Sequence, residues 1–175
     1  DKSFRIGWEG SITQQLGKYF AIHGNLALSA NKIKAFDEAL FDYTDGFEKV
    51  IIAHKNSDIS FSPSVVSAIQ LMVKPMTNLE IEFSSKFVSK QYLDNTSNEA
   101  RSLPSFHYEN LRAAYTIASK YWKSASVTLM VNNLFDIQYS SNGYTYSYIF
   151  NDLITENFLY PQAGRHLMFG CKVGL

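Results

Sequence analysis

Apolar and polar side chains alternate along most of this chain, and that two-residue period is the feature that most constrains its fold. The clearest example runs from Leu79 to Phe87. Its apolar members stand at odd positions and its polar members at even positions: Leu79, Ile81, Phe83 and Phe87 against Glu80, Glu82, Ser84 and Lys86. Because successive side chains of a β-strand point to opposite faces, the pattern predicts strands that are apolar on one side only.

The same period recurs along the chain and predicts about seven main strands. They cover residues 4–13, 19–31, 65–74, 79–87, 106–118, 124–135 and 164–175. Residues 48–55 are a candidate for a small extra strand inside a less regular segment, 32–64. Residues 90–105 are interpreted as a polar loop, and residues 136–163 as a long loop rich in tyrosine. This series predicts an all-β fold, an antiparallel up-and-down meander.

The connections between the predicted strands are alternately short and long. Short ones fall near residues 16, 76 and 120, and long ones at 32–64, 90–105 and 136–163. Outer-membrane barrels have this asymmetry, with short periplasmic turns, long outer loops and an even number of strands. The pattern therefore predicts an outer-membrane barrel whose C-terminus is periplasmic. The odd strand count predicts further strands before residue 1.

Alternation alone does not decide which face meets lipid. A soluble ligand-binding barrel of the lipocalin kind would turn the apolar faces inward and the polar faces outward. The polar face holds Arg5, Glu9, Glu80, Glu82, Lys86 and Arg112. A third alternative, a complete small outer-membrane barrel with an anchoring role, needs an eighth strand, for which residues 47–55 are the candidate. Aromatic residues near strand ends favour an outer-membrane barrel, because such residues form a girdle at the lipid boundary: Trp8, Tyr19, Tyr92, Tyr121, Trp122 and Tyr160.

Composition excludes several other classes. The formal net charge is zero, and Lys and Arg are scattered, so no nucleic-acid partner is predicted. Cys171, the single cysteine, is interpreted as a small apolar side chain, and no Cys and His spacing resembles a metal site. The four histidines accompany no nucleophile pattern, so we predict neither an enzyme nor a cofactor. No stretch approaches the roughly 18 apolar residues of a membrane helix.

Three segments of the sequence match the patterns of one family. Val131-Asn132-Asn133-Leu134-Phe135-Asp136-Ile137-Gln138-Tyr139 and Tyr160-Pro161-Gln162-Ala163-Gly164-Arg165 resemble signatures near the end of TonB-dependent outer-membrane receptors. Lys86-Phe87-Val88-Ser89-Lys90-Gln91-Tyr92-Leu93-Asp94-Asn95 resembles a strand-to-loop segment of receptors of the Bacteroidota type, and Ser60-Phe61-Ser62-Pro63 also fits. The resemblance covers essentially the whole chain.

The resemblance implies that residues 1–175 are the C-terminal portion of a large transmembrane barrel of the 22-stranded class. Such a receptor imports a scarce nutrient chelate, an iron–siderophore complex or a cobalamin. Energy reaches it from TonB through an N-terminal plug, which this sequence does not contain. The expected partners are outer-membrane lipid, the chelate, the TonB complex, and the barrel-assembly machinery, which would act through the C-terminal strand.

The tyrosine-rich segment supplies the candidate ligand-binding residues: Tyr139, Tyr144, Tyr146 and Tyr148. Aromatic side chains at the mouth of a barrel can stack on a chelate or hydrogen-bond to it. The alternative is that these residues belong to the interfacial girdle or pack one loop against another.

Overall fold

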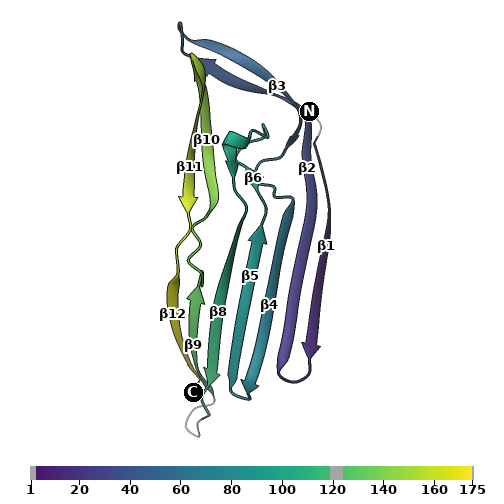
Figure 1. Ribbon diagram of the computed structural model, residues 1–175, viewed down its shortest axis with the longest axis vertical. Helices are drawn as coiled ribbons and strands as arrows, with labels where there is room; N and C mark the ends of the chain where they lie inside the picture. The colour runs from purple at the N-terminus through teal and green to yellow at the C-terminus, as the bar shows by residue number, and fades with distance from the viewer. Residues whose placement is uncertain (1–2, 119–123, 175) are drawn as a thin grey trace.

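A single curved β-sheet dominates the structure (Figure 1). The computed structural model describes residues 3–118 and 124–174. Its pairings are antiparallel apart from one parallel residue pair, Ile149 with Asp42. Within the described residues, no helix is both long enough and apolar enough to cross a membrane. The structure confirms the predicted all-β fold.

Seven strands form the wall of the sheet, and their order in space is their order along the chain. They are β1 (Ser3–Leu16), β2 (Phe20–Asp42), β4 (Val65–Met76), β5 (Leu79–Val88), β8 (Phe106–Thr116), β9 (Ser124–Asn132) and β12 (His166–Gly174). Each strand pairs antiparallel with the next. This is the up-and-down meander that the alternation predicts.

The two ends of the sheet differ (Figure 1). At one end, residues 17–19 and 77–78 make short turns, and the C-terminus lies at the same end. Residues 119–123, where the third short connection was predicted, lie outside the described residues. The long connections all gather at the opposite end, which we call the loop end. The predicted asymmetry between the two ends is therefore present.

Two of the predicted long loops contain regular strands, which corrects the sequence interpretation. β2 continues to Asp42 and pairs with β3 (Glu48–Asp58), so most of segment 32–64 is a hairpin. The candidate strand at residues 48–55 is therefore confirmed, as part of β3. Segment 136–163 holds a second hairpin, β10 (Ser140–Phe150) and β11 (Asp152–Pro161). The connection between β5 and β8 contains two short strands and one 3-10 turn: β6 (Gln91–Tyr92), β7 (Ser102–Leu103) and η1 (Glu99–Arg101).

One face of the sheet is apolar and exposed. On β2 it comprises the even positions from Phe20 to Ala30, and Lys18, Lys32 and Lys34 stand beyond its two ends. Eleven residues match the roughly 9–11 that a tilted strand needs to span a bilayer. The register continues this face across the sheet, since Leu71 stands between Ile22 and Phe83. Exposed side chains on the same face include Ile6, Trp8, Ile12, Leu28, Ile69, Leu129, Leu167 and Phe169.

The opposite face is polar, and several of its charges are paired. We call it the inner face. The carboxylate of Glu80 lies 3.2 Å from Lys74 Nζ and 3.2 Å from Arg112 Nη1. Arg112 Nη1 also lies 3.8 Å from Glu82 Oε2. Glu80 and Glu82 therefore belong to a network of ion pairs with Lys74 and Arg112.

Neither face of the sheet covers an apolar core. Among the described residues, the fully buried apolar side chains are Leu40, Val88, Leu93, Leu103, Phe106 and Ala125, and most of them lie at the loop end. A soluble barrel would hide the apolar face, whereas here that face is the exposed one. Such a surface needs an apolar surrounding, because exposed patches of this extent are unfavourable in water.

The aromatic residues expected near strand ends are distributed unevenly. Trp8 pairs with Leu28, which pairs with Val65 at the loop-side end of β4, so Trp8 lies level with the end of that strand. Tyr19 lies in the short turn after β1. Tyr92 and Tyr160 belong to elements of the loop end. Tyr121 and Trp122 lie outside the described residues.

Candidate functional site at the loop end

The segment between β9 and β10 begins with a tight turn that contains Asn133, a residue of the family resemblance. Asn133 is buried and has a φ of +50°, in the left-handed region that asparagine tolerates better than most residues. Its side-chain oxygen accepts a hydrogen bond from the backbone N–H of Ile137 at 2.9 Å. Its side-chain amide donates to the carbonyl oxygens of Ile137 and Ala163, at 2.9 and 3.2 Å. One side chain thus closes the turn and joins it to the segment before β12.

Asp136 makes a second link between the same two segments. Its Oδ1 accepts a hydrogen bond from the backbone N–H of Arg165 at 2.7 Å. A Cβ atom at Gly164 would lie 2.6 Å from Asp136 Oδ1, so only glycine allows this approach. The two signature segments near the C-terminus therefore meet in space. We call Asn133, Asp136 and Gly164 the turn clasp.

Replacing Asn133 by alanine should destabilise the protein by about 3 kcal/mol. The change removes three hydrogen bonds of about 1 kcal/mol each and leaves buried partners unpaired. It also places alanine, which tolerates the left-handed region less well than asparagine, at a φ of +50°. Urea unfolding of the complete protein in lipid vesicles measures the effect. Asn133→Gly is the matched control, because it loses the same bonds without the backbone cost and should lose less. Equal stability of Asn133→Ala and the wild type would contradict this role.

The other signature segments also meet at the loop end. Asn95 Oδ1 accepts a hydrogen bond from the backbone N–H of Ser60 at 2.8 Å. The backbone N–H of Phe61 donates to the carbonyl oxygen of Tyr92 at 3.0 Å. The connection between β3 and β4 is thereby held against the connection between β5 and β8. These matched residues have a structural role in ordering the loops.

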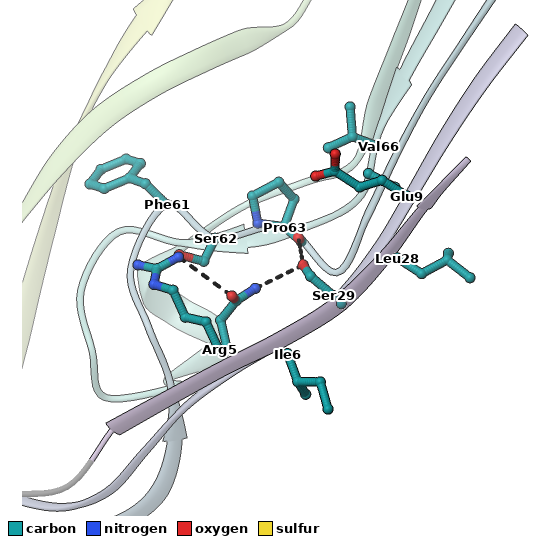
Figure 2. Close-up of a pocket in the computed structure, with 12 residues that line it drawn as sticks. Arg5, Ile6, Glu9, Leu28, Ser29, Phe61, Ser62, Pro63 and Val66 are labelled. Atoms are coloured by element: carbon teal, nitrogen blue, oxygen red, sulfur yellow. Dashed lines mark hydrogen bonds between the residues drawn. The ribbon is translucent and has the colours of Figure 1, made fainter. Parts of the chain in front are cut away.

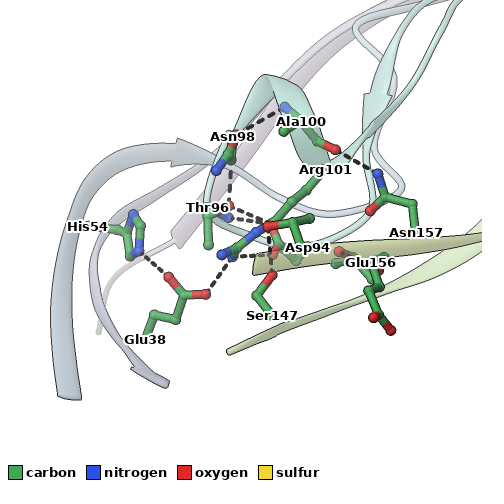
Figure 3. Close-up of polar contacts among 12 residues, drawn as sticks. Glu38, His54, Asp94, Thr96, Asn98, Ala100, Arg101, Ser147, Glu156 and Asn157 are labelled. Carbon is green, nitrogen blue, oxygen red and sulfur yellow. Dashed lines mark hydrogen bonds and ion pairs between the residues drawn. The ribbon is translucent and has the colours of Figure 1, made fainter. Parts of the chain in front are cut away.

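A buried arginine lies at the centre of this loop packing (Figure 3). The Arg101 side chain is 2% exposed, and its Nη1 contacts Glu38 Oε1 at 2.5 Å and Asp94 Oδ2 at 2.9 Å. The other oxygen of Glu38 lies 2.8 Å from His54 Nε2. Burial works to lower the pKa of the Arg101 guanidinium, but the hydrogen bonds that it donates to Glu38 and Asp94 outweigh burial and raise that pKa. We call these four residues the Arg101 cluster.

The Arg101 cluster joins two separate connections, and a neighbouring hydrogen bond adds a third. Glu38 and His54 come from the β2–β3 hairpin, and Asp94 and Arg101 from the connection between β5 and β8. The side-chain amide of Asn157 on β11 donates to the carbonyl oxygen of Ala100 at 2.6 Å, which adds the β10–β11 hairpin. Figure 3 shows these side chains converging from the three segments. The loops at this end therefore form one packed unit.

A cavity of about 640 Å³ lies on the inner face beneath the connection between β3 and β4 (Figure 2). Arg5 Nη1 donates to Ser62 Oγ at 3.0 Å and to Asn31 Oδ1 at 3.4 Å. Glu9 also lines the cavity. Ile6 points the other way, on the apolar side of the strand (Figure 2). The volume lies within the range of small-molecule sites, and the guanidinium could hold an anionic group.

The four predicted tyrosines do not form one group. Tyr139 stacks on Phe106 and Tyr108, with ring centroids 4.6 and 5.4 Å apart. Burial, followed by the nearby Tyr108, raises the pKa of the Tyr139 hydroxyl. This residue packs a connection against β8, in the manner of the loop-packing alternative.

Tyr144, Tyr146 and Tyr148 share one face of β10, which we call the tyrosine face. Tyr144 and Tyr146 are 49% and 50% exposed. Tyr144 stacks on Phe158 of β11 at 4.8 Å, and Tyr148 meets the edge of Tyr43 at 6.2 Å. The alternating residues Ser147 and Asn157 belong to the opposite face, which contacts the connection holding Arg101 (Figure 3). The hairpin thus presents three tyrosines on an accessible surface.

Sequence reasoning missed the Arg101 cluster. Glu38 and His54 stand in a segment without clear period, and Arg101 is a single cation in a polar loop. Asp94 stands out in the sequence only as part of the matched segment 86–95 in the predicted polar loop. The separation of 63 residues between Glu38 and Arg101 leaves no local signal for their contact. In the part of the chain that the structure describes, no three His, Cys, Asp or Glu side chains gather as a metal site would require.

Comparison with known proteins reveals similarity in fold. No family model matches the chain, and no curated protein matches it. The siderophore receptor PiuA from Acinetobacter baumannii has a similar structure, with a TM-score of 0.70, 14% identity, and 97% of this chain covered. The ferric citrate transporter FecA in the unliganded form gives a TM-score of 0.51, 16% identity and 94% coverage. The chain spans 21% of the length of the first protein and 30% of the second.

Proposed function

We propose that this chain is the C-terminal part of the barrel of a TonB-dependent outer-membrane receptor that imports a scarce nutrient chelate. The observation that carries the proposal is the exposed apolar face. On β2 this face extends over eleven residues along the strand, and lysines stand beyond both of its ends. That face suits lipid, and the paired charges of the inner face suit a water-filled or protein-filled barrel interior. The likeness in fold to a siderophore receptor and a ferric citrate transporter supports the same function.

The orientation follows from the asymmetry of the sheet. In outer-membrane barrels the short turns are periplasmic and the long loops face outward. The C-terminus lies with the short turns (Figure 1), so we place it in the periplasm. The loop end, with the tyrosine face and the Arg5 cavity, would then meet the external medium. The signature segments support a receptor of the Bacteroidota type.

The proposed ligand is an iron–siderophore complex or a cobalamin. Tyr144, Tyr146 and Tyr148 would offer ring faces for stacking and hydroxyl groups for hydrogen bonds. Arg5, with Nη1 bound to Ser62, could pair with an anionic group of a chelate that has passed inward. Import would leave the ligand chemically unchanged, so the proposal assigns no catalytic residue to the chain.

Three further partners belong to the proposal. Outer-membrane lipid would cover the apolar face, and the barrel-assembly machinery would act through β12. TonB would deliver energy through a plug domain encoded outside residues 1–175. A plug fits the inner face, whose polar and charged side chains can be satisfied by another polar surface.

Fractionation of cells that make the complete protein tests this assignment. We expect the protein in the outer-membrane fraction, with a band on gels whose migration changes on heating, as a folded barrel gives. Growth of a deletion strain on each iron chelate or on cobalamin as the limiting source then identifies the substrate. Recovery of the complete protein in the soluble fraction would refute the proposal.

Changing Tyr144, Tyr146 and Tyr148 together to alanine should weaken ligand binding by at least tenfold. A tenfold loss of affinity corresponds to about 1.4 kcal/mol of binding free energy. Aromatic contacts of this kind contribute roughly 0.5–1.5 kcal/mol each, so the loss of three of them is sufficient. Binding of ferric citrate, a ferric catecholate siderophore and cobalamin to the purified complete protein measures the effect.

Two controls sharpen this experiment. The triple change to phenylalanine keeps the rings and should retain most of the binding if stacking dominates. Phe135→Ala removes an exposed aromatic side chain that lies outside the tyrosine face and should leave affinity unchanged. If the triple alanine variant binds its chelate as tightly as the wild type, the tyrosine face is not the ligand site.

A further inference from the structure

A groove on the apolar face crosses β1, β2 and β4. Its volume is about 420 Å³, and Gly24 on β2 leaves part of its floor without a side chain. Its walls are apolar: Trp8, Ile12, Leu26 and Ile69. The Trp8 ring lies so close to Gly10 that a Cβ atom there would overlap it. Trp8 is therefore folded along the sheet and forms a wall of the groove.

The groove lies at the middle of the apolar face. Gly24 and Leu26 are central to the even positions between Phe20 and Ala30 on β2. Gly24 is four residues from Phe20, the first residue of β2, which is roughly 13 Å along the strand. For a strand tilted by about 45° this distance corresponds to a depth of about 9 Å below the start of the strand, well inside the roughly 30 Å hydrocarbon core.

Lys18 provides a cation at the short-turn end of the same hairpin. It is exposed, and its Nζ lies 4.9 Å from the centre of the Tyr19 ring. A phosphate at Lys18 would have its acyl chain running along the exposed apolar side chains of Phe20 and Ile22 toward Gly24. The depth of the groove matches the reach of one such chain. The position of the cation and the position of the groove thus fit one molecule.

We infer that the groove holds the acyl chain of a phospholipid whose phosphate is bound at Lys18. The inference rests on the membrane position proposed above. The Trp8 ring covers Gly10, whereas Gly24 has no side chain over it and only Ile12 and Ala68 nearby. At Gly24 a chain can descend to the backbone between apolar side chains on both sides, which increases dispersion contacts. The site selects a phospholipid by combining this groove with a cation at the correct depth.

Fluorescence quenching by brominated lipid tests the inference. The complete protein is reconstituted in vesicles of phosphatidylethanolamine and phosphatidylglycerol, in which a varied fraction of the phosphatidylglycerol carries bromine on the distal half of one chain. The Trp8 signal is the difference between the wild type and Trp8→Phe. We expect half-maximal quenching of Trp8 at a mole fraction at least threefold lower than random mixing of lipids gives.

Two variants separate the groove from the headgroup site. Gly24→Val fills the groove, because a Cβ there meets Ile12 Cγ2 at 3.5 Å and no backbone atom closer than 3.9 Å. Valine also suits a strand, so the variant should fold. It should return the quenching curve to that of random mixing. Lys18→Gln should do the same for phosphatidylglycerol. Gly170→Val on the inner face, where an added Cβ meets only Thr128 Cβ at 3.9 Å, is the matched control and should behave as the wild type.

The possible failures are distinguishable. Quenching that follows random mixing in the wild type, and is unchanged in Gly24→Val, would overturn the groove site and leave the membrane position intact. Absence of any Trp8-dependent quenching would show that this face does not meet lipid, and the proposed membrane position would then fail as well.

Discussion

Replacing Leu71 by lysine should abolish most of the folded protein in the outer membrane. Leu71 is 38% exposed on the apolar face, between Ile22 and Phe83. A lysine there would place an ammonium group in hydrocarbon, which costs about 2–4 kcal/mol near the middle of a bilayer. Since natural proteins are stable by only about 5–15 kcal/mol, assembly should suffer strongly. The heat-modifiable band in outer-membrane fractions measures the folded amount.

Gln70→Lys is the matched control for this experiment. Gln70 is the adjacent residue of β4 and points to the inner face, opposite His23. The same side chain there meets water or polar groups, so the folded amount should stay near that of the wild type. Normal assembly of Leu71→Lys would mean that lipid does not cover the apolar face. Equal damage from both variants would mean that the effect does not depend on the face.

Replacing Arg101 by alanine should release the loops from one another. Both carboxylates that it pairs with, Glu38 and Asp94, are mostly buried. Removing one partner of a buried ion pair typically costs about 3–5 kcal/mol, because the remaining charge is left uncompensated. A loss of about 3 kcal/mol in local stability accelerates exchange of the protected amides roughly 100-fold.

Hydrogen exchange of amides bonded across the loops reports this change. Three suitable amides are those of Asp58, Ser60 and Phe61, which donate to Ser97, Asn95 and Tyr92. The wall strands should keep their protection. Glu99→Gln is the control, since Glu99 pairs with Lys90 in an exposed ion pair of the same connection, and exposed pairs contribute little. Unchanged exchange in Arg101→Ala would show that the loops are held by other contacts.

The wall of the sheet could be predicted from sequence because its two faces meet different surroundings. In β5, Ile81, Glu82 and Phe83 alternate between apolar and polar, and their side chains alternate between the two faces of the sheet. The two-residue period is therefore visible in the local sequence alone. The turn at Gly17, with a φ of +69°, has the same local character.

The β10–β11 hairpin was predicted as a loop, and only residues 48–55 of the β2–β3 hairpin were a candidate strand, because the faces of these hairpins do not differ in this way. In β10, aromatic and polar residues do alternate from Tyr144 to Ser147, but both faces of the hairpin contact water or other loops. In the β2–β3 hairpin the alternation is also interrupted at Asn56, which has a φ of +54°. Its neighbours Lys55 and Ser57 pair with β2, whereas Asn56 itself has no partner there.

The candidate site was predictable only in part. The alternation of Tyr144, Tyr146 and Tyr148 could be seen in the sequence and places them on one face. Tyr139 precedes Tyr144 by only five residues, but it stacks on Phe106 and Tyr108 and not on the hairpin. The turn clasp reverses the direction of the chain before Tyr139, which accounts for this difference. Contacts such as that of Arg101 with Glu38 depend on how whole connections fold together, and no local pattern carries that information.

The β2–β3 hairpin extends across the loop end and its tip meets the tip of the β10–β11 hairpin. The backbone N–H of Tyr43 donates to the carbonyl oxygen of Ile149 at 2.9 Å, and that of Asn151 donates to Thr44 Oγ1 at 2.8 Å. Phe47, beside this junction, is 67% exposed. The two tips, 107 residues apart in sequence, therefore form one discontinuous epitope. An antibody raised against it should label the native protein on whole cells and lose recognition once the chain is denatured.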